Sequence, residues 1–283
     1  MTPSAAVPEP QPPRVSVVIV SFNRVESLRQ SLQMLGDTHR IIVVDNGSRD
    51  GAEALSDEFP AVRFSRLPKN FGLTKALNIG LRSVEGEFIL CLHDDTLISG
   101  EAVMRLADFL ESRPEVGAVC PLLTDDSGNP VPQARALPTP GNPDPSLNLP
   151  AAREENGEET VVECVSGAAI MFRAFFLRAL RQVDERYGTY GSGIELCAQI
   201  RRAAKKIVIL RTVTAIHEGL DSPMPRGALE GDRAAGTAAF LGKHHGFVSG
   251  LIYRLKTALL ALVTFRFSVL MGVLSGQKID GTG

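Results

Sequence analysis

Residues 87–96 read EFILCLHDDT, in which five apolar residues (88–92) run directly into His93, Asp94 and Asp95. The apolar run has the length and composition of a buried strand, so both carboxylates should follow its carboxyl end. Burial without a partner raises the pKa of a carboxyl group and neutralises it, so an adjacent pair needs a positive charge nearby. A divalent metal carrying a phosphorylated ligand would supply that charge, because Mg²⁺ binds carboxylate and phosphate oxygens. The alternative is an acidic loop without a ligand.

Strands and helices alternate around this stretch, which predicts the α/β fold class with a mostly parallel sheet between helices. In the first half, the expected strands are Val15–Val20, Ile41–Val44, Val62–Phe64, Phe88–Leu92 and Val116–Leu123. The expected helices there are Val25–Leu35, Leu73–Ser83 and Ala102–Glu111. In the second half we expect strands at Val161–Val165, Ile207–Leu210 and Val213–Ile216, and helices at Ala174–Arg181 and Ile194–Ala204.

Three segments depart from this alternation. Residues 1–14 hold five prolines and no apolar core, so we expect a disordered lead-in and not a signal peptide. Residues 125–150 hold seven prolines without periodicity, which predicts a long loop or lid. We therefore expect one domain over residues 15–232, with a Pro-rich loop at 125–160, and a tail over residues 233–283.

The overall composition is that of an ordinary globular protein. Of 283 residues, 44% are hydrophobic and 22% are charged, and the net charge of −2 gives no reason to expect nucleic acid as a partner. The cysteines are widely spaced and have no zinc-binding pattern, so we expect buried thiols in a reducing compartment. They are Cys91, Cys120, Cys164 and Cys197.

Polar side chains follow three of the expected strands. The segment Ser21-Phe22-Asn23-Arg24 follows the first strand, Asp45 follows the second, and the Asp94-Asp95 pair follows the fourth. Carboxyl ends of parallel strands meet at one edge of a sheet, where open α/β sheets bind ligands. We therefore expect these groups to converge on one ligand.

The ordered set of motifs resembles the inverting glycosyltransferases of family 2, which have the GT-A fold. The matching segments are Val15–Arg24, Val43–Gly51, Asn70–Gly80, Phe88–Thr96, Gly167–Arg173 and Val183–Glu218. Within the family the chain is most similar to the rhamnosyltransferase-type enzymes of polysaccharide assembly. The resemblance implies a UDP-, dTDP- or GDP-sugar donor. It also implies transfer, with inversion, to a hydroxyl of a glycan or lipid-linked acceptor.

For the nucleotide, the resemblance implies roles for five residues. Asp45 would accept a hydrogen bond from the base, although it could instead satisfy its own turn. Phe22 and Asn23 belong to the loop that would pack on the base. Lys75 would reach a phosphate, or else be a solvated helix lysine. Asp94 would occupy the variable middle position of the metal motif, on the nucleotide side.

For the metal, the resemblance implies a Mg²⁺ or Mn²⁺ ion held by Asp95 and His217. Asp95 matches the last aspartate of the metal motif of the family, and His217 follows a strand as the late histidine of the family does. The ion would act as a Lewis acid on the departing nucleoside diphosphate. A structural histidine at a strand end is the alternative for His217.

The catalytic-base motif is where the chain departs from the family. Family members have a Glu-Asp pair in which the Asp removes the acceptor proton, but ungapped alignment puts Ser192 and Gly193 there. Neither can act as a carboxylate base. Glu195 is the nearest candidate, either as the base or as a structural carboxylate at a helix amino terminus.

This departure leaves two functional hypotheses. The chain is a glycosyltransferase, or it is a catalytically degenerate sugar-nucleotide-binding or scaffold protein of the same fold. A nucleotidyltransferase would need a Gly-rich, basic phosphate loop after the first strand, and residues 21–24 offer none.

The tail is basic and apolar. No acidic residue lies between Asp232 and Asp280, and residues 257–274 are almost wholly apolar apart from Arg266. A central Arg costs about 2.5–3.5 kcal/mol on insertion scales, which disfavours a clean membrane span. Basic residues around an apolar helix suit an anionic membrane surface, so we expect a cytoplasmic protein that binds peripherally to the inner face of the membrane. A helical pair packed on the domain or in a dimer is the alternative.

Overall fold

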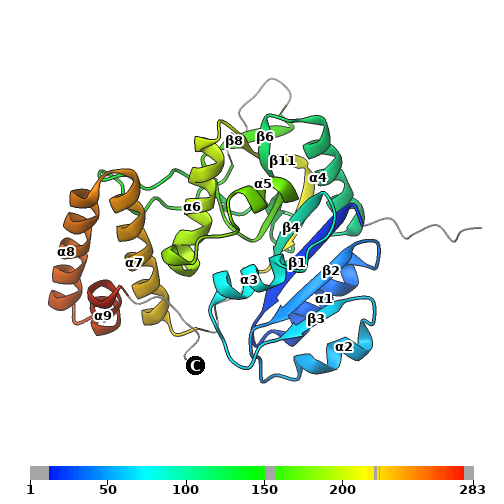
Figure 1. Cartoon of the computed structure of the whole chain (residues 1–283), viewed down its shortest axis with the longest axis horizontal. Helices are drawn as coiled ribbons and strands as arrows, with labels where there is room; N and C mark the ends of the chain where they lie inside the picture. Colours follow the sequence, from blue (N-terminus) through cyan, green and yellow to red (C-terminus); the bar gives the residue numbers. More distant parts are fainter. Residues whose placement is uncertain (1–12, 151–156, 220–221, 223, 277–283) are drawn as a thin grey trace, which may run out of the picture.

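A mostly parallel sheet forms the centre of the computed structural model, which describes residues 13–150, 157–219, 222 and 224–276 (Figure 1). Its strands are β1 (Val15–Ser21), β2 (Arg40–Asp45), β3 (Arg63–Arg66), β4 (Phe88–His93), β5 (Thr96–Leu97), β6 (Val116–Thr124), β8 (Glu159–Val162), β10 (Ala169–Arg173) and β11 (Lys206–His217). Their order is β3-β2-β1-β4-β10-β6-β11-β5, and β8 pairs with β11. A separate pair joins β7 (Ala134–Arg135) to β9 (Cys164–Val165).

The strand directions confirm the expected fold class. β3, β2, β1 and β4 are parallel neighbours, and β6 is parallel to β11. β10 runs antiparallel to both β4 and β6, and β5 and β8 run antiparallel to β11. All seven residues of β1 are buried, as expected for a β-branched strand covered on both faces.

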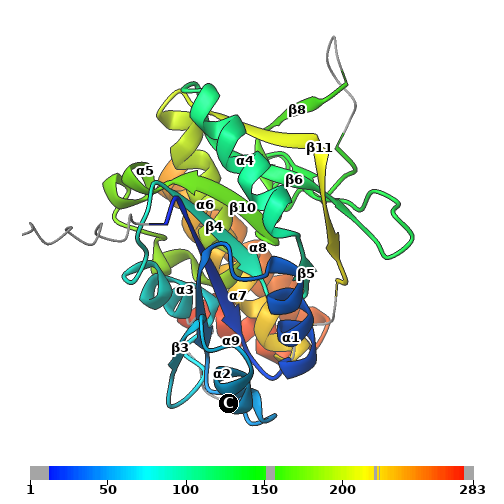
Figure 2. The same cartoon turned by 90° about the vertical axis from the view of Figure 1, so that its right-hand side faces the viewer.

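Helices cover both faces of the sheet. The helices are α1 (Val25–Leu35), α2 (Leu55–Glu58), α3 (Leu73–Leu81), α4 (Gly100–Ser112), α5 (Ala174–Ala179), α6 (Gly188–Arg202), α7 (Arg226–His244), α8 (Phe247–Val263) and α9 (Phe267–Ser275), with 3-10 turns at Ala52–Ala54 and Glu185–Tyr187. One apolar core lies between the sheet and α1 and α4, and a second lies between the sheet and α3, α5 and α6 (Figure 2).

Several expected boundaries were wrong. The two short strands expected at 207–210 and 213–216 are one strand, β11, with an irregularity between Leu210 and Thr214. Helix α6 begins at Gly188, two turns earlier than expected, so Glu195 lies in mid-helix and not at an amino terminus. The proposed domain boundary at residue 232 falls inside α7, which begins after Pro225.

Other expectations concern loops and thiols. The Pro-rich segment 125–150 is irregular apart from β7 and two isolated bridges, as its composition predicted. The four cysteines are free and buried, again as predicted. Residues 1–12 of the expected lead-in, residues 151–156 of the Pro-rich loop and the end of the tail lie outside the described residues.

The carboxyl-terminal helices α7, α8 and α9 form a bundle beside the sheet domain (Figure 1). They meet through small residues: an added Cβ at Gly250 would lie 2.9 Å from the Cα of Gly242, and one at Gly272 would lie 2.8 Å from that of Gly231. None of the helices in the described part of the chain combines the length and the apolar character that crossing a bilayer requires.

A buried ion pair joins this bundle to the sheet domain. The Glu195 side chain on α6 is fully buried and accepts hydrogen bonds from Lys243 Nζ at 2.6 Å and Gln199 Nε2 at 2.8 Å. His244 Nε2 on α7 lies 2.7 Å from the other carboxylate oxygen. Burial alone would raise the pKa of Glu195, but these partners lower it. Glu195 is therefore ionised and fastens α6 to α7.

The charge of Glu195 should make stability depend on pH. Its folded-state pKa is lowered, so its contribution is present above the unfolded value, about 4.3, and is lost as pH falls through the folded value. Urea titrations should show that Glu195→Gln destabilises the protein by about 3 kcal/mol at neutral pH, because it leaves the Lys243 ammonium without its anionic partner. The difference should shrink as the pH falls below 4. Glu58→Gln, which removes an exposed partner of Arg29, is the control and should change the midpoint little.

Candidate functional site

The carboxyl ends of β1, β2 and β4 meet at one edge of the sheet. Ser21 is paired with Asp45 across β1 and β2, and Val20 is paired with His93 across β1 and β4. The polar groups that follow these strands are therefore brought together, as predicted from the parallel arrangement.

A cavity of about 400 Å³ opens at this edge and is called the acidic cavity. Its wall contains Phe22, Arg24, Asn46, Asn70, His93, Asp94, Asp95 and His217. Asp94 and Asp95 are both buried, with 6% and 2% of their surface exposed. The cavity therefore presents two carboxylates that are almost wholly removed from bulk water.

Arg24 supplies a positive charge to this acidic pair. Its Nη1 donates to Asp95 Oδ2 at 2.9 Å and lies 3.4 Å from Asp94 Oδ1. Arg24 lies in the loop that follows β1, and β1 is the immediate neighbour of β4. The need for a cation at the acidic pair is thus partly met by the protein itself.

Two histidines stand on the other side of Asp95. His217 Nδ1 lies 3.4 Å from Asp95 Oδ1 and His93 Nδ1 lies 3.9 Å from it. The pairing of β5 with β11 sets Thr96 opposite His217, and Thr96 Oγ1 is 3.3 Å from His217 Nδ1. The short strand after the acidic turn therefore carries His217 to the carboxylate.

The protonation states differ across the cavity. Burial raises the pKa of Asp94 to about 6. Burial would also raise the pKa of Asp95, but His217, His93 and Arg24 lower it to about 2. Burial lowers the pKa of His93 to about 4, whereas Asp95 outweighs burial at His217 and raises its pKa. At neutral pH, Asp95 is therefore an anion beside a neutral His93.

The acidic cavity has donor atoms suited to a divalent metal. Asp95 Oδ1 is buried and has no hydrogen-bond partner among the described residues, and the imidazole of His217 stands beside it. In that part of the chain no group of three or more His, Cys, Asp or Glu side chains is arranged to hold a metal. Mg²⁺ sites commonly use one or two carboxylates and take their remaining ligands from substrate phosphates and water. Asp95 and His217 fit a metal bound in that way.

Asp45 lies beside the acidic cavity and not in its wall, where its neighbour Asn46 lies. Its Oδ1 accepts from the backbone N–H of Ser48 at 2.8 Å, as in the turn that the sequence left open as an alternative. Its Oδ2 is buried without a hydrogen-bond partner among the described residues, although Arg66 Nε lies 3.5 Å away. One oxygen thus holds the turn, and the other remains able to accept a hydrogen bond.

The two residues expected to pack on the nucleoside base, Phe22 and Asn23, have different positions. Phe22 lines the acidic cavity. Asn23 has a left-handed backbone (φ 53°), and its backbone N–H donates to Ser48 Oγ at 2.9 Å. Its side-chain oxygen accepts from the backbone N–H of Arg49 at 2.8 Å. Asn23 therefore fixes the loop after β1 to the loop after β2.

The position of Lys75 does not agree with the expected phosphate-binding role. Its side chain is exposed, lies outside the cavity walls and places Nζ 5.0 Å from the centre of the Phe71 ring. On the next turn, Asn78 donates to the Val183 carbonyl at 2.8 Å and to Glu185 Oε1 at 2.9 Å. Asn78 thus packs α3 against the segment before α6.

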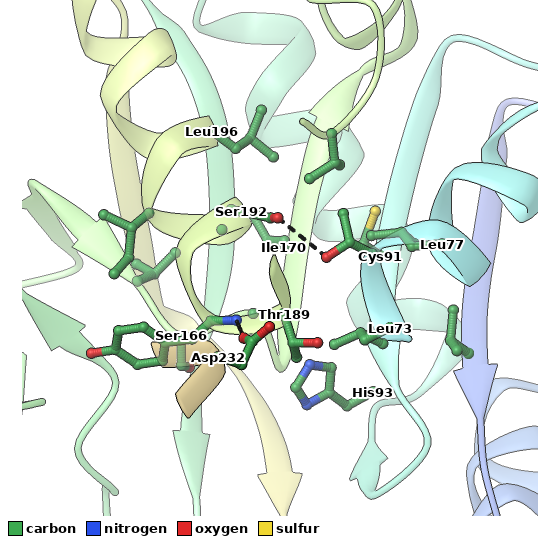
Figure 3. Close-up of a pocket in the computed structure, with 18 of the residues that line it drawn as sticks. Leu73, Leu77, Cys91, His93, Ser166, Ile170, Thr189, Ser192, Leu196 and Asp232 are labelled. Atoms are coloured by element: carbon green, nitrogen blue, oxygen red, sulfur yellow. Dashed lines mark hydrogen bonds between the residues drawn. The ribbon is translucent and has the colours of Figure 1, made fainter. Parts of the chain in front are cut away.

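A second cavity of about 560 Å³ adjoins the first and is called the apolar cavity (Figure 3). Most of its wall consists of apolar side chains, with charged groups from α7 at one side. Both cavities share Val20, Leu73, His93, Thr189 and Leu229. The two cavities therefore adjoin at these residues.

The family base positions face the apolar cavity without a carboxylate. Ser192 and Gly193 line it, but Glu195 does not. Glu195 is fully buried against α7 and is held by Lys243 and His244. This position disagrees with the expectation that Glu195 is the catalytic base.

Sequence reasoning missed Arg24 as the partner of the acidic pair and His93 as a residue common to both cavities. It also missed the link in which Asn46 Nδ2 donates to Asn70 Oδ1 at 2.9 Å. The signal for Arg24 was present, because two buried carboxylates require a cation and Arg24 follows the adjacent strand. Pairing between Asn46 and Asn70 has no comparable signal in the sequence.

Solved structures of glycosyltransferases are similar in fold. Residues 1–349 of S. aureus TarS match with a TM-score of 0.56 and 16% identity, over 93% of this chain and 80% of that chain. The mannosyltransferase PcManGT from Pyrobaculum calidifontis, solved with GDP-Man and Mn²⁺, matches with a TM-score of 0.56 and 15% identity, over 96% and 76%. At these identities the likeness shows the fold alone, and it confirms the GT-A architecture.

Sequence relatives and a family model give the same result. A poly-beta-1,6-N-acetyl-D-glucosamine synthase of Staphylococcus epidermidis is 27% identical over 37% of this chain and 27% of its own length. An N-acetylglucosaminyltransferase of Sinorhizobium fredii is 32% identical over 40% of this chain and 30% of its own length. The chain thus spans under a third of these relatives. Because the family model matches residues 16–181, more than half of the sequence, the chain belongs to glycosyl transferase family 2.

Proposed function

We propose that the chain transfers a sugar, with inversion, from a nucleotide-sugar donor to an acceptor hydroxyl, and that this transfer depends on a divalent metal. The observation that carries the proposal is the buried, ionised Asp95, whose Oδ1 has no hydrogen-bond partner in the part of the chain that the structure describes and stands beside His217 at the edge of the sheet. The adjoining apolar cavity provides a separate space for an acceptor. Two communicating cavities, one acidic and one largely apolar, suit a reaction between two bound substrates.

On the donor side, Asp95 and His217 would hold Mg²⁺ or Mn²⁺. A bound divalent ion would supply Lewis acidity and neutralise charge on the leaving diphosphate. Arg24, which donates to Asp95 Oδ2 in the wall of the same cavity, would add a second positive charge for phosphate groups. Asp45 would accept from the nucleoside base through Oδ2, while Phe22 packs on the base from the cavity wall.

The chemistry of Asp45 indicates which donor nucleotides to test. A buried carboxylate acceptor at Asp45 suits the N–H of uracil, thymine or guanine, so UDP-, dTDP- and GDP-sugars are the donors to test. The rhamnosyltransferase-type resemblance stays a prediction, and so does the glycan or lipid-linked acceptor.

We further propose that α8 rests on an anionic membrane surface. Its exposed stripe of Val248, Leu251, Ile252, Leu255, Leu259, Leu262 and Val263 repeats at helical spacing, while Gly250 and Ala261 are buried. No acidic residue lies between Asp232 and Asp280, and Lys256 is exposed beside the stripe. An apolar stripe with basic flanks suits a bilayer interface that carries negative lipid headgroups.

Calorimetry with UDP, dTDP and GDP should show metal-dependent binding of at least one nucleotide. Asp95→Ala should weaken that binding at least tenfold, because it removes the carboxylate that faces both metal and phosphate. Chelation of the metal should weaken wild-type binding to a similar level. Asp108→Ala, which removes an exposed partner of Arg14 at the opposite end of β1 from the acidic cavity, is the control and should bind as wild type. Equal affinities for wild type and Asp95→Ala would contradict the metal site.

Asp45→Asn should separate base recognition from phosphate recognition. The asparagine keeps an oxygen for the Ser48 N–H and replaces Oδ2 by an NH₂ donor that opposes the N–H of the nucleobase. Affinity for the preferred nucleoside diphosphate should fall about 10- to 100-fold. Affinity for inorganic diphosphate should not change. A loss shared equally by both ligands, or by neither, would contradict the assignment.

Membrane binding can be measured by sedimentation with vesicles of phosphatidylcholine, with and without phosphatidylglycerol. The double variant Leu255→Glu/Leu259→Glu should lower binding to the anionic vesicles about tenfold or more, because each leucine no longer buries apolar surface. Phe175→Glu changes an equally exposed side chain on α5 and serves as the control. The stripe is instead a contact between two copies if the wild type does not bind vesicles and sediments as a dimer while the double variant sediments as a monomer.

A further inference from the structure

The apolar cavity needs a proton acceptor if the proposed transfer takes place in it. The family positions cannot provide one: Ser192 Oγ donates to the carbonyls of Asp184 and Gly188, and Gly193 has no side chain. Of the described residues that line this cavity, Glu230 and Asp232 are the carboxylates, and both come from α7. The candidate bases therefore belong to α7 and not to α6.

The two carboxylates of α7 differ in their surroundings. Glu230 is ion-paired with Arg266, and about a third of its side chain is exposed. Asp232 is 2% exposed, and its Oδ2 accepts from the backbone N–H of Tyr190 at 3.2 Å. Figure 3 shows the Asp232 carboxylate beside Thr189, with His93 on the same side of the cavity. Thr189 and His93 also line the acidic cavity, so Asp232 stands near the junction of the two.

The start of α6 is built around this carboxylate. Gly188 has φ +69°, and a Cβ added there would lie 2.2 Å from Asp232 Oδ1. One turn on, a Cβ at Gly191 would lie 3.2 Å from the Cα of Gly236, because α6 and α7 approach closely. Glycine at these points lets α7 bring Asp232 against the first turn of α6. The carboxylate thus lies against the first turn of α6, one turn before Ser192 and Gly193, where the family carries its own base.

We propose that Asp232 is the general base of this transferase, supplied by α7 in place of the missing acidic pair on α6. This assignment rests on the proposed function. The acceptor hydroxyl gives its proton to the Asp232 carboxylate while its oxygen forms the new bond to the anomeric carbon. The bond between that carbon and the diphosphate oxygen breaks, and its electron pair leaves with the nucleoside diphosphate. Asp232 then returns the proton to solvent.

The decisive variant is Asp232→Asn, which keeps an oxygen for the Tyr190 N–H but cannot accept a proton. The donor is chosen by calorimetry among UDP-GlcNAc, GDP-mannose and dTDP-rhamnose. Turnover is followed as release of the nucleoside diphosphate, with water as acceptor where no glycan acceptor is known. Turnover should fall about 100-fold or more, as expected for loss of a general base. Donor affinity and the melting temperature should stay near wild type.

The pH profile separates a base from a structural carboxylate. Wild-type kcat should fall on the acid side as the base becomes protonated, and Asp232→Asn should lose this acid limb. The other charged or titratable side chains among the described residues of the cavity wall are Cys91, His93, Arg135, Tyr190, Arg226, Glu230 and Arg233. All of these remain in the variant, so loss of the limb identifies Asp232.

Two further variants complete the test. Glu185→Gln makes the same acid-to-amide change three residues before α6, outside the cavity walls, and should keep wild-type turnover. Gly193→Asp has open space for its side chain and, added to Asp232→Asn, should recover turnover by returning a carboxylate to α6.

Three outcomes would overturn the assignment of Asp232: turnover of Asp232→Asn within about threefold of wild type, an acid limb that persists in that variant, or a wild type that binds the donor and never consumes it. The last would favour the sugar-nucleotide-binding protein. A wild type that binds no nucleotide would instead refute the proposed function itself.

Discussion

The burial of two adjacent carboxylates at the end of β4 is the constraint on which the site depends. Desolvation opposes their charge, so the surrounding chain must stabilise at least one anion. The loop after β1 brings Arg24, and the pairing of β5 with β11 brings His217. Sheet topology therefore determines the electrostatics of the site, since β1 on one side of β4 and the paired strands β5 and β11 after its turn each deliver a group to the carboxylates.

The fold was largely predictable because the apolar runs alternate with helical patterns and because parallel strands present their ends at one edge. Asp45, Asp94 and Asp95 gather there for that reason alone. The start of α6 was not predictable, because residues 188–193 contain three glycines and have low helix propensity. Contact with α7 holds them in a helix. Partners of Glu195 lie 48 and 49 residues away in the sequence, so its structural role was equally hidden.

The carboxyl-terminal helices reverse the usual distribution of side chains. Glycines and alanines lie in the contacts between α7, α8 and α9, and many large apolar side chains of α8 and α9 face outward. The hydropathy of the sequence includes residues in helix contacts and residues that face outward, and it cannot distinguish the two. In the sequence, the apolar run 257–274 with its central Arg266 therefore looked unsuitable for a clean membrane span. The structure divides this run between α8 and α9 and turns large apolar side chains outward.

The close backbone contact of α6 with α7 has a geometric consequence. Because α7 both lines the apolar cavity and packs on α8, it connects the cavity to the helix that carries the outward apolar face. If that face lies on a bilayer, the reacting centre is held at a fixed height above the lipid. Acceptors anchored in the membrane would then be sorted by the length of the spacer between their anchor and their hydroxyl. Acceptors would then be selected by the length of this spacer, without recognition of their sugar.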